Sequence, residues 1–358
     1  SLTASHPGGY PEMDKQKLTL RIKEQAHKLG FTLVGIASPA PPSHLDFLRD
    51  WLNEGYHASM DWIGTERSLE RRSDPQKILP ECKSILVLAA PHPTPRGNIR
   101  GGNIAAYALN QDYHIVLEKL LKEIVTNIEE WVGDTVPNRV YVDTGPVLEK
   151  ELAMRAGLGW IGKNTLLINR DYGSYFFLAE ILLGVELITD QPNIDTYCGN
   201  CTNCLDNCPT QALIEPYTLD ANRCISYLTI EHREGIPEDL RPKMGDWIFG
   251  CDICQIVCPW NKPGAEWPDI LEELLPREDL LEIDLVEELG LDQTEFSSRY
   301  KGSPVKRTKR RGYLRNVAVA LGNRGGEDAV PALEKALDDD EPLVQDAAEW
   351  ALGRIRGK

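Results

Sequence analysis

The segment CGNCTNCLDNCP, residues 198–209, places four cysteines at a C-x2-C-x2-C-x3-C spacing and ends in proline. This is the ligand spacing of bacterial proteins that hold two [4Fe–4S] clusters. One loop of this length can bring the thiolates of Cys198, Cys201 and Cys204 to one cluster, while Cys208 points to a different one. The run therefore predicts a second cluster and a second group of ligands.

The second group is found in CDICQIVCP, residues 251–259, which repeats the run without its leading cysteine. Ile248 stands where that cysteine would be, so another thiol has to replace it. Cys224, between the two runs, is the candidate. The pattern thus accounts for eight ligands.

The exchange of the last cysteine between the two runs determines the expected ligand sets. The first cluster takes Cys198, Cys201, Cys204 and Cys258, and the second takes Cys208, Cys224, Cys251 and Cys254. Structural zinc bound by paired C-x2-C units is the alternative. Zinc needs four ligands at each site but does not explain why both runs end in Cys-Pro.

The remaining bulk features favour a folded cytoplasmic protein. No stretch approaches the ~20 apolar residues of a membrane-spanning helix, and the N-terminus lacks the order of a secretory signal. In a reducing compartment stable disulfides are the least favoured use of nine cysteines. Cys82, before the apolar run 84–90, is expected to fill the core.

The order of elements predicts a mixed α/β, or α+β, fold. We expect helices at 11–30, 114–131 and 145–157, and strands at 31–37, 85–90 and 139–142. The predicted domains are an α/β domain at 10–190, a ferredoxin-like domain with two [4Fe–4S] clusters at 191–263, an acidic connector of solvated helices at 264–300 and a helical end at 301–358.

The helical end contains an internal repeat. The triplet Ala-Leu-Gly at 320–322 recurs at 351–353, each time closing an expected helix, and 329–337 supplies a partner helix. Such pairs are typical of HEAT-like solenoid repeats. We expect a short docking arm rather than a long solenoid.

A basic segment enters this arm, although the whole chain has a formal net charge of -16. The stretch KGSPVKRTKRRGYLR, residues 301–315, contains no acidic residue, and Tyr313 within it favours RNA. A basic surface of this kind can hold a phosphate backbone. The candidate RNA contacts are Lys306, Arg307, Lys309, Arg310, Arg311 and Arg315. The alternative is a solvated turn that balances the preceding acidic stretch.

Further motifs are spread over most of the chain. They are YA at 107–108 with DYH at 112–114, VDTGPVLE at 142–149, AGLGWIGKN at 156–164, RCISYLTIE at 223–231, CPWN at 258–261, and RN at 315–316 before ALGN at 320–323. With the two cysteine runs, these motifs resemble the epoxyqueuosine reductase family. The sequence departs from the family's pattern at Ala106 and Gly145. The first departure leaves any side-chain role at position 106 in doubt.

The resemblance implies a cobalamin-binding domain related to the nitroreductase fold, and reduction of epoxyqueuosine to queuosine in tRNA. It implies that electrons from an external low-potential donor pass through the clusters to cobalamin. Asp143 is the implied proton donor, and burial beside a corrin is expected to raise its pKa. The candidate corrin contacts are Arg71, Tyr107, Gly159, Trp160, Ile161, Lys163 and Asn164. We expect a monomer without membrane contacts.

Two other functions compete with this hypothesis. A cobalamin-dependent reductive dehalogenase shares the cofactors, but it has no use for the basic segment or the helical repeats. A non-catalytic iron–sulfur electron carrier would need the clusters, but not a large additional α/β domain.

Overall fold

The computed structural model describes residues 14–92, 103–261 and 270–357. Residues 10–13 of the predicted first domain, and 262–263 and 264–269 on either side of a predicted boundary, lie outside the described residues. Within the described ranges, no helix is long and apolar enough to cross a membrane.

A four-stranded antiparallel sheet forms the centre of the N-terminal half, with strand order β1-β2-β7-β4. Its strands are β1 Leu33–Ala37, β2 Ser84–Pro91, β7 Phe176–Leu183 and β4 Asn138–Tyr141. All eight residues of β2 are buried, because the sheet is covered on both faces. The strands expected at 31–37, 85–90 and 139–142 are confirmed, with ends that differ by one or two residues.

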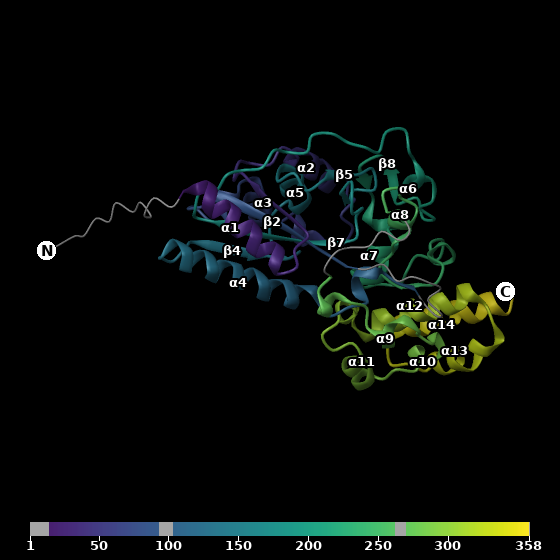
Figure 1. Ribbon diagram of the computed structural model, residues 1–358. Helices are drawn as coiled ribbons and strands as arrows, with labels where there is room; N and C mark the ends of the chain where they lie inside the picture. Colours follow the sequence, from purple (N-terminus) through teal and green to yellow (C-terminus); the bar gives the residue numbers. More distant parts are fainter. Residues whose placement is uncertain (1–13, 93–102, 262–269, 358) are drawn as a thin grey trace.

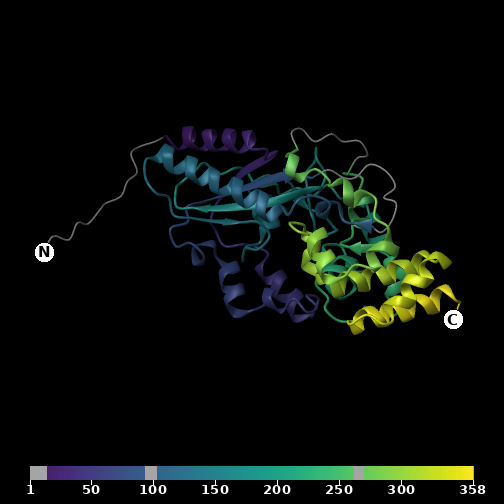
Figure 2. The same cartoon turned by 90° about the horizontal axis from the view of Figure 1, so that it is seen from below.

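Two long helices cover one face of this sheet, and three shorter ones lie toward the other (Figure 2). The long helices are α1 Lys15–Lys28 and α4 Tyr113–Val132; the short ones are α2 Leu45–Asn53, α3 Glu66–Ser73 and α5 Glu149–Arg155. The helix expected at 145–157 is thus shorter than predicted. Its first residues form the loop that follows β4 instead.

The cysteine-bearing part consists of short elements packed beside the sheet domain (Figure 1). They are the hairpins β5 Trp160–Ile161 with β6 Leu167–Ile168 and β8 Leu213–Glu215 with β9 Thr218–Leu219, the helices α6 Asn203–Asp206, α7 Ile225–Ile230 and α8 Ile253–Ile256, and β10 Trp247–Phe249, which pairs with β3 Asn103–Ile104. The two four-residue helices α6 and α8 lie side by side. α6 carries Cys204, the third thiol of the first run, and α8 carries Cys254, its equivalent in the second run. The repeated sequence therefore forms a repeated structure.

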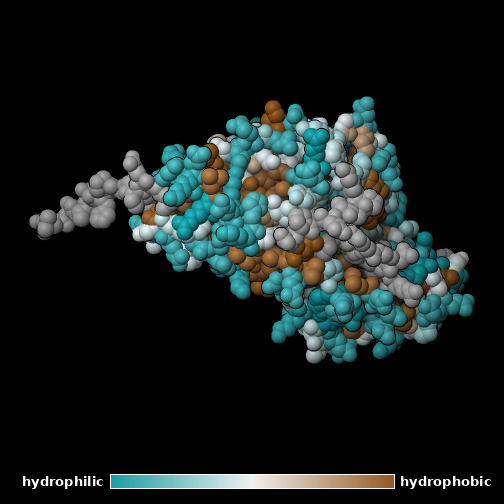
Figure 3. Space-filling view, in the orientation of Figure 1, coloured by the Kyte–Doolittle hydropathy of each residue, from teal (hydrophilic) through white to brown (hydrophobic). Residues whose placement is uncertain are grey.

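The C-terminal helices share one hydrophobic core with the cysteine-bearing part. They are α9 Glu278–Leu281, α10 Leu285–Leu289, α11 Gln293–Arg299, α12 Lys309–Arg324, α13 Val330–Ala336 and α14 Pro342–Ile355. The expected repeat is confirmed, since α12 packs against α14 and α13 packs against α14. On the face shown in Figure 3, apolar side chains gather between the sheet domain and this helical end.

The acidic stretch before residue 300 differs from its prediction. Its helices are not simply solvated, because Leu280, Leu285 and Phe296 are buried in the C-terminal core. Leu274, at the start of the same stretch, is buried in the core beneath α1 and α4. The acidic stretch thus contains apolar side chains that pack into both hydrophobic cores, and these contacts join the two halves of the molecule.

Candidate functional site

The first expected ligand set surrounds a hollow. Cys198, Cys201, Cys204 and Cys258 all line it, together with the aromatic side chains of Tyr197 and Trp260 and with other groups. The Cys258 thiol interacts electrostatically with the thiols of Cys198 and Cys201. In the described residues no three such side chains converge as ligands of a single ion do, and these four enclose a space instead. An iron–sulfur cluster fits this arrangement better than zinc.

The second expected set is assembled from three separate segments. The Cys251 thiol interacts with those of Cys224 and Cys208, and the Cys254 thiol interacts with those of Cys251 and Cys224. Burial raises the pKa of Cys251 and Cys254, and proximity to the other thiols adds to the effect. Such crowded thiols are suited to metal coordination, which takes up the negative charge.

The glycine-rich stretch at 156–164 packs against the loops that carry the cysteines. The Lys163 Nζ donates to the carbonyl oxygens of Gly199 at 2.6 Å and Cys201 at 2.9 Å. The Trp160 side chain is only 1% exposed and packs between Tyr197 and Trp260. Both side chains therefore contact the first thiol set, and the corrin contacts expected from them stay predictions.

Two further residues of that stretch have structural explanations. A Cβ atom at Gly159 would lie 2.2 Å from the Ile168 carbonyl oxygen, so the β5–β6 hairpin requires a glycine here. The corrin contact expected at Gly159 stays a prediction. The Asn164 side-chain amide lies 3.4 Å from the Cys254 carbonyl oxygen, beside the second thiol set. Ile161 is half-buried, and nothing in the structure gives it a particular role.

Asp143 lies in the loop directly after β4, with a positive φ of 60°. Its Oδ2 accepts a hydrogen bond of 2.8 Å from the Tyr113 hydroxyl and lies 3.6 Å from the His114 Nε2. Gly145 follows because a Cβ there would lie 2.4 Å from the Tyr141 ring. The close packing of this turn thus explains one departure from the family pattern.

The residues around Asp143 favour its charged form. His114 and Tyr113 hold the pKa of Asp143 below its ordinary value, and burial opposes them with a smaller effect. The side chain is 61% exposed, and burial is still the main influence that raises its pKa. The raised pKa expected beside a corrin concerns the covered carboxyl group and stays a prediction.

His114 is the functional candidate that sequence reasoning passed over. Burial alone would lower its pKa, but hydrogen bonds with Asp112 and Asp143 raise it to about 9. Its Nδ1 lies 2.7 Å from Asp112 Oδ1. The imidazolium therefore stays charged at neutral pH and joins the two carboxylates. The DYH motif was a visible signal, although an N-terminal helix residue is more often a simple cap.

Tyr107 and Lys150 connect the Asp143 loop with the second thiol set. The Lys150 ammonium interacts with the side chains of both Asp143 and Cys254. The half-buried Tyr107 interacts with Asp143 and with Asp252, the neighbour of Cys251. A group bound between the carboxylate and these thiols would therefore contact both side chains. Of the expected corrin contacts, Tyr107 is the one whose side chain is placed here.

Two arginines of α3 lie on another side of the same loop. Arg71 is close enough to Tyr141 to lower its pKa, although burial raises that pKa more strongly. Arg72 interacts with the Glu149 carboxylate. Arg71 therefore remains a candidate contact at the border of the site.

The basic segment is only partly available to a nucleic acid. Arg315 is 1% exposed and donates to three backbone carbonyl groups, those of Leu228, His232 and Glu234. The nucleic-acid contact predicted for Arg315 is wrong, because its guanidinium group is buried and donates its hydrogen bonds to groups of the protein. Tyr313, also buried, cannot stack on a base.

The remaining members of the segment divide into two groups. Arg310 forms an ion pair of 2.6 Å with Asp339, and Arg307 forms one with Glu231. The Arg307 guanidinium also interacts with Asp143, which places the start of the helical end beside the catalytic candidate. Lys306 and Lys309 are exposed, and Arg311 is half-buried.

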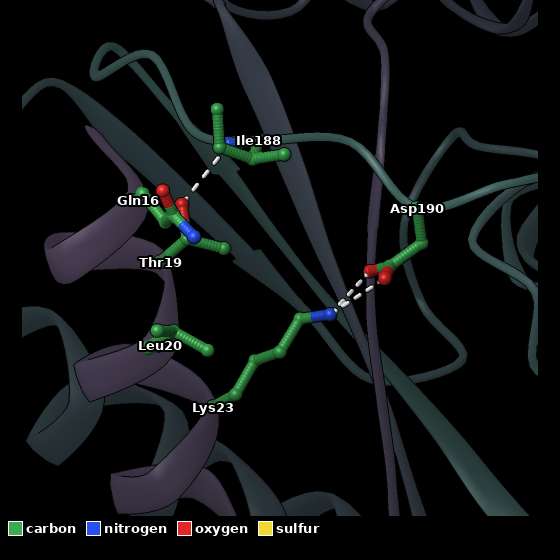
Figure 4. A pocket seen from close by; sticks show the side chains of 6 residues that line it. All are labelled: Gln16, Thr19, Leu20, Lys23, Ile188 and Asp190. Atoms are coloured by element: carbon green, nitrogen blue, oxygen red, sulfur yellow. Dashed lines mark hydrogen bonds and ion pairs between the residues drawn. The ribbon is translucent and has the colours of Figure 1, made fainter.

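A separate hollow lies away from the thiols, between α1 and the segment after β7 (Figure 4). Its charged groups satisfy one another: the Lys23 Nζ lies 2.6 Å from both carboxylate oxygens of Asp190. Asp190 also accepts from the Ile36 backbone N–H, and the Thr19 hydroxyl accepts from that of Ile188. These contacts fix the segment that leads to Cys198.

Family models match three parts of the chain. The matched descriptions are "4Fe-4S double cluster binding domain" over residues 197–261, "Epoxyqueuosine reductase QueG, DUF1730" over residues 72–144 and "PBS lyase HEAT-like repeat" over residues 314–339. The first match shows that the cysteine-bearing part is a domain for two iron–sulfur clusters, as expected.

Curated relatives match nearly the whole length. The chain is 41% identical to the epoxyqueuosine reductase of Xanthomonas campestris over 350 residues, which are 95% of this chain and 97% of the relative. It is 37% identical to that of Escherichia coli, over 96% of this chain and 90% of the relative.

Solved structures of the same name have the same fold. An epoxyqueuosine reductase in complex with an epoxyqueuosine-modified tRNA-Tyr stem loop matches with a TM-score of 0.87 at 31% identity, over 95% of this chain and 90% of that chain. The Bacillus subtilis epoxyqueuosine reductase with its catalytic loop swung out of the active site matches with a TM-score of 0.86 at 30% identity, with the same coverage.

Proposed function

The chain belongs to the epoxyqueuosine reductase family, and on this premise we propose that it removes the epoxide oxygen of epoxyqueuosine at the wobble position of a tRNA. Members of this family are oxidoreductases of tRNA modification. The observation that carries the proposal is the position of Asp143, an ion-paired carboxylate linked through Lys150 to the second thiol set.

The reaction needs both an electron supply and a proton supply. Two electrons and two protons convert the epoxide into an alkene and one water molecule, as both carbon–oxygen bonds break. Iron–sulfur clusters deliver electrons one at a time, which suits a chain of two clusters fed by an external low-potential donor. The protein has to supply position and protons.

The two ligand sets are those that the spacing predicts. The hollow lined by Cys198, Cys201, Cys204 and Cys258 supports the first set. The mutual interactions of Cys208, Cys224, Cys251 and Cys254 support the second. Because Lys150 interacts with Cys254 and with Asp143, electrons would leave the protein from the second cluster.

Cobalamin would be held between Asp143 and the second set. The residues present suit it, since Tyr107 and Lys150 bridge this region and the Asp143 carboxylate is open to it. When bound, cobalamin would supply a cobalt centre that accepts electrons one at a time and reaches a strongly nucleophilic reduced state. Tyr107, Lys150 and Arg71 are the residues of this chain that would hold it.

Asp143 acts as the proton donor to the epoxide oxygen. Covering its exposed carboxylate with a cofactor and a substrate would remove water and raise its pKa, so that it can hold a proton. His114, already charged, lies 3.6 Å away and can restore the proton after it has been given up. Positioned acids of this kind contribute roughly a hundredfold to ten-thousandfold to a rate.

The tRNA would approach from the helical end. The related complex contains a tRNA stem loop, and here Lys306, Lys309 and Arg311 have side chains that are not buried. Arg307 lies between this surface and Asp143. The phosphate backbone would bind these cations, while the wobble nucleotide reaches the Asp143 loop.

The test is anaerobic turnover with the cluster-loaded chain, cobalamin, a strong reductant and tRNA bearing epoxyqueuosine. Mass spectrometry of the wobble nucleoside should show loss of one oxygen that depends on cobalamin. Asp143→Asn should abolish this loss, whereas Asp46→Asn, at an exposed position of α2, should not. An unchanged nucleoside with reduced clusters and bound cobalamin would refute the substrate and favour an electron carrier or a dehalogenase.

A further inference from the structure

Glu180 is an acidic residue in the middle of a buried strand. It lies on β7, opposite Val87 of β2 and Tyr141 of β4, and its side chain is inaccessible to solvent. In the described part of the chain, no hydrogen-bond donor reaches either of its carboxylate oxygens. An isolated carboxylate in such a position would cost several kcal/mol. The group therefore has to be protonated or share a proton.

Glu149 is the partner that makes such sharing possible. It is the first residue of α5, which packs against β7, and its carboxyl group is close enough to that of Glu180 to raise the Glu180 pKa. Its Oε1 also accepts a hydrogen bond of 2.8 Å from the backbone N–H of Asp143. Glu149 thus connects the buried carboxyl group to the loop that carries the proposed proton donor.

The surroundings favour one proton on this pair at neutral pH. Two buried carboxyl groups in contact cannot both ionise without strong repulsion. Burial, followed by the nearby Asp143 charge, raises the pKa of Glu149 to about 7, and burial raises that of Glu180 well above its usual range. The other groups that face the pair are Arg72 of α3, Tyr113 of α4, Tyr141 of β4, Asp143 of the loop and Lys150 of α5.

We propose that Glu149 and Glu180 share one proton and act together as a latch for the Asp143 loop. Protonated Glu180 donates to the Glu149 carboxylate, and that carboxylate accepts the Asp143 backbone N–H. Both glutamates are positioning residues, and this role rests on the proposed function of Asp143. The backbone at Asp143, in the left-handed region, needs such a contact to hold it.

The latch has a defined pH response. Between the pKa of Glu149, about 7, and the higher pKa of Glu180, one proton is present and the Asp143 N–H has a charged acceptor. At lower pH Glu149 gains a second proton and this acceptor becomes neutral. As pH rises and the pair loses its proton, the two carboxylates repel each other, and the only one free to move is Glu149, at the helix end. The loop is then released. The positive charges of Arg72 and Lys150 weaken this repulsion but do not replace the hydrogen bond between the two glutamates.

The proposal is tested by infrared spectroscopy and hydrogen exchange on the full cluster-loaded chain. At neutral pH the spectrum should contain the carbonyl stretch of a buried protonated carboxyl group, and Glu180→Gln should remove it. Glu180→Gln keeps a donor to Glu149, so exchange in peptides covering residues 142–148 should stay slow. Glu180→Leu removes the donor and should speed that exchange by roughly tenfold to a hundredfold.

The matched control is Glu151→Gln, a buried glutamate of the same helix that accepts from Ser43 and His44 instead. It should leave both the infrared band and the loop exchange unchanged. At alkaline pH, after correction for intrinsic exchange rates, the wild-type loop should lose protection while the Glu180→Gln loop keeps it.

Three results would overturn the latch: a missing infrared band in the wild type, equal loop exchange in the Gln and Leu variants, or a wild-type loop whose protection does not change with pH. If Glu180→Leu fails to fold, the band and the pH response of Glu180→Gln still decide. These measurements need no turnover. A failure of the substrate assignment would therefore leave them intact, while a failure of the latch would leave the Asp143→Asn result intact.

Discussion

The two thiol sets are built in different ways. Three thiols of the first set come from one short loop, and its hollow is bordered by Tyr197, which is 40% exposed. The second set draws Cys208, Cys224 and the pair Cys251 and Cys254 from three segments, and it lies beside the Asp143 loop. On the proposed function, the first set would receive electrons from an external donor and the second would face the substrate. The second thiol set lies near Asp143 because of the tertiary fold, and the local spacing of its cysteines does not determine this.

The largest effect is expected when one thiol is removed from each set in turn, because the two variants should then differ in turnover. Cys251→Ala should abolish turnover with every reductant, because it breaks the cluster next to Asp143. Cys198→Ala should abolish turnover with a protein donor but leave part of it with a small chemical reductant, which can reach the second cluster directly. Iron content and turnover measure both variants. Equal residual activity with the small reductant would show that the sets do not act in this order.

The next effect concerns His114, on the substrate side. The His114 pKa is raised to about 9, so its ion pair with Asp143 is complete below the ordinary histidine pKa and is lost as pH rises through about 9. Turnover should therefore fall on this alkaline limb. His114→Gln should lower turnover at neutral pH by roughly tenfold to a hundredfold and remove the limb. A limb that persists in the variant would assign it to another group.

A smaller effect should appear on the donor side at Lys163. Lys163→Met removes two hydrogen bonds to the first thiol loop, each with a net contribution of roughly 1.5–3 kcal/mol at most for a charged donor. Chelators should bleach the first cluster faster, while the signal of the second changes little. Lys77→Met, at an exposed position, is the control. Equal bleaching of both clusters would mean that the two loops are not independent.

The smallest effect should be found on the tRNA surface. Arg311→Ala should weaken tRNA binding a few-fold and reduce its salt dependence by about one phosphate contact, without changing the rate of cluster reduction. Arg315→Ala should instead lower the unfolding temperature, because it leaves three buried carbonyl groups without a donor. If both variants changed binding alone, the division of the basic segment would be wrong.

The sequence alone determined the features that are local. Ligand spacing, the triplet repeat near residues 320 and 351, and the apolar strands are encoded within short windows, so the two-cluster domain, the helical arm and three strands of the sheet could be predicted. The motif around Asp143 also predicted the candidate acid. A lone glutamate in the apolar run FFLAEILL, residues 176–183, was a signal for Glu180 that local reasoning did not use.

Tertiary structure decided which of these groups act together. Asp143, Tyr113 and His114 meet because β4 ends against the start of α4, and Glu149 reaches Glu180 because α5 lies over β7. The same packing buried Arg315 and turned Lys163 toward the first thiol loop. A charge pattern cannot distinguish a cation that meets RNA from one that satisfies buried carbonyl groups. That choice depends on desolvation, which is set by contacts far apart in the chain.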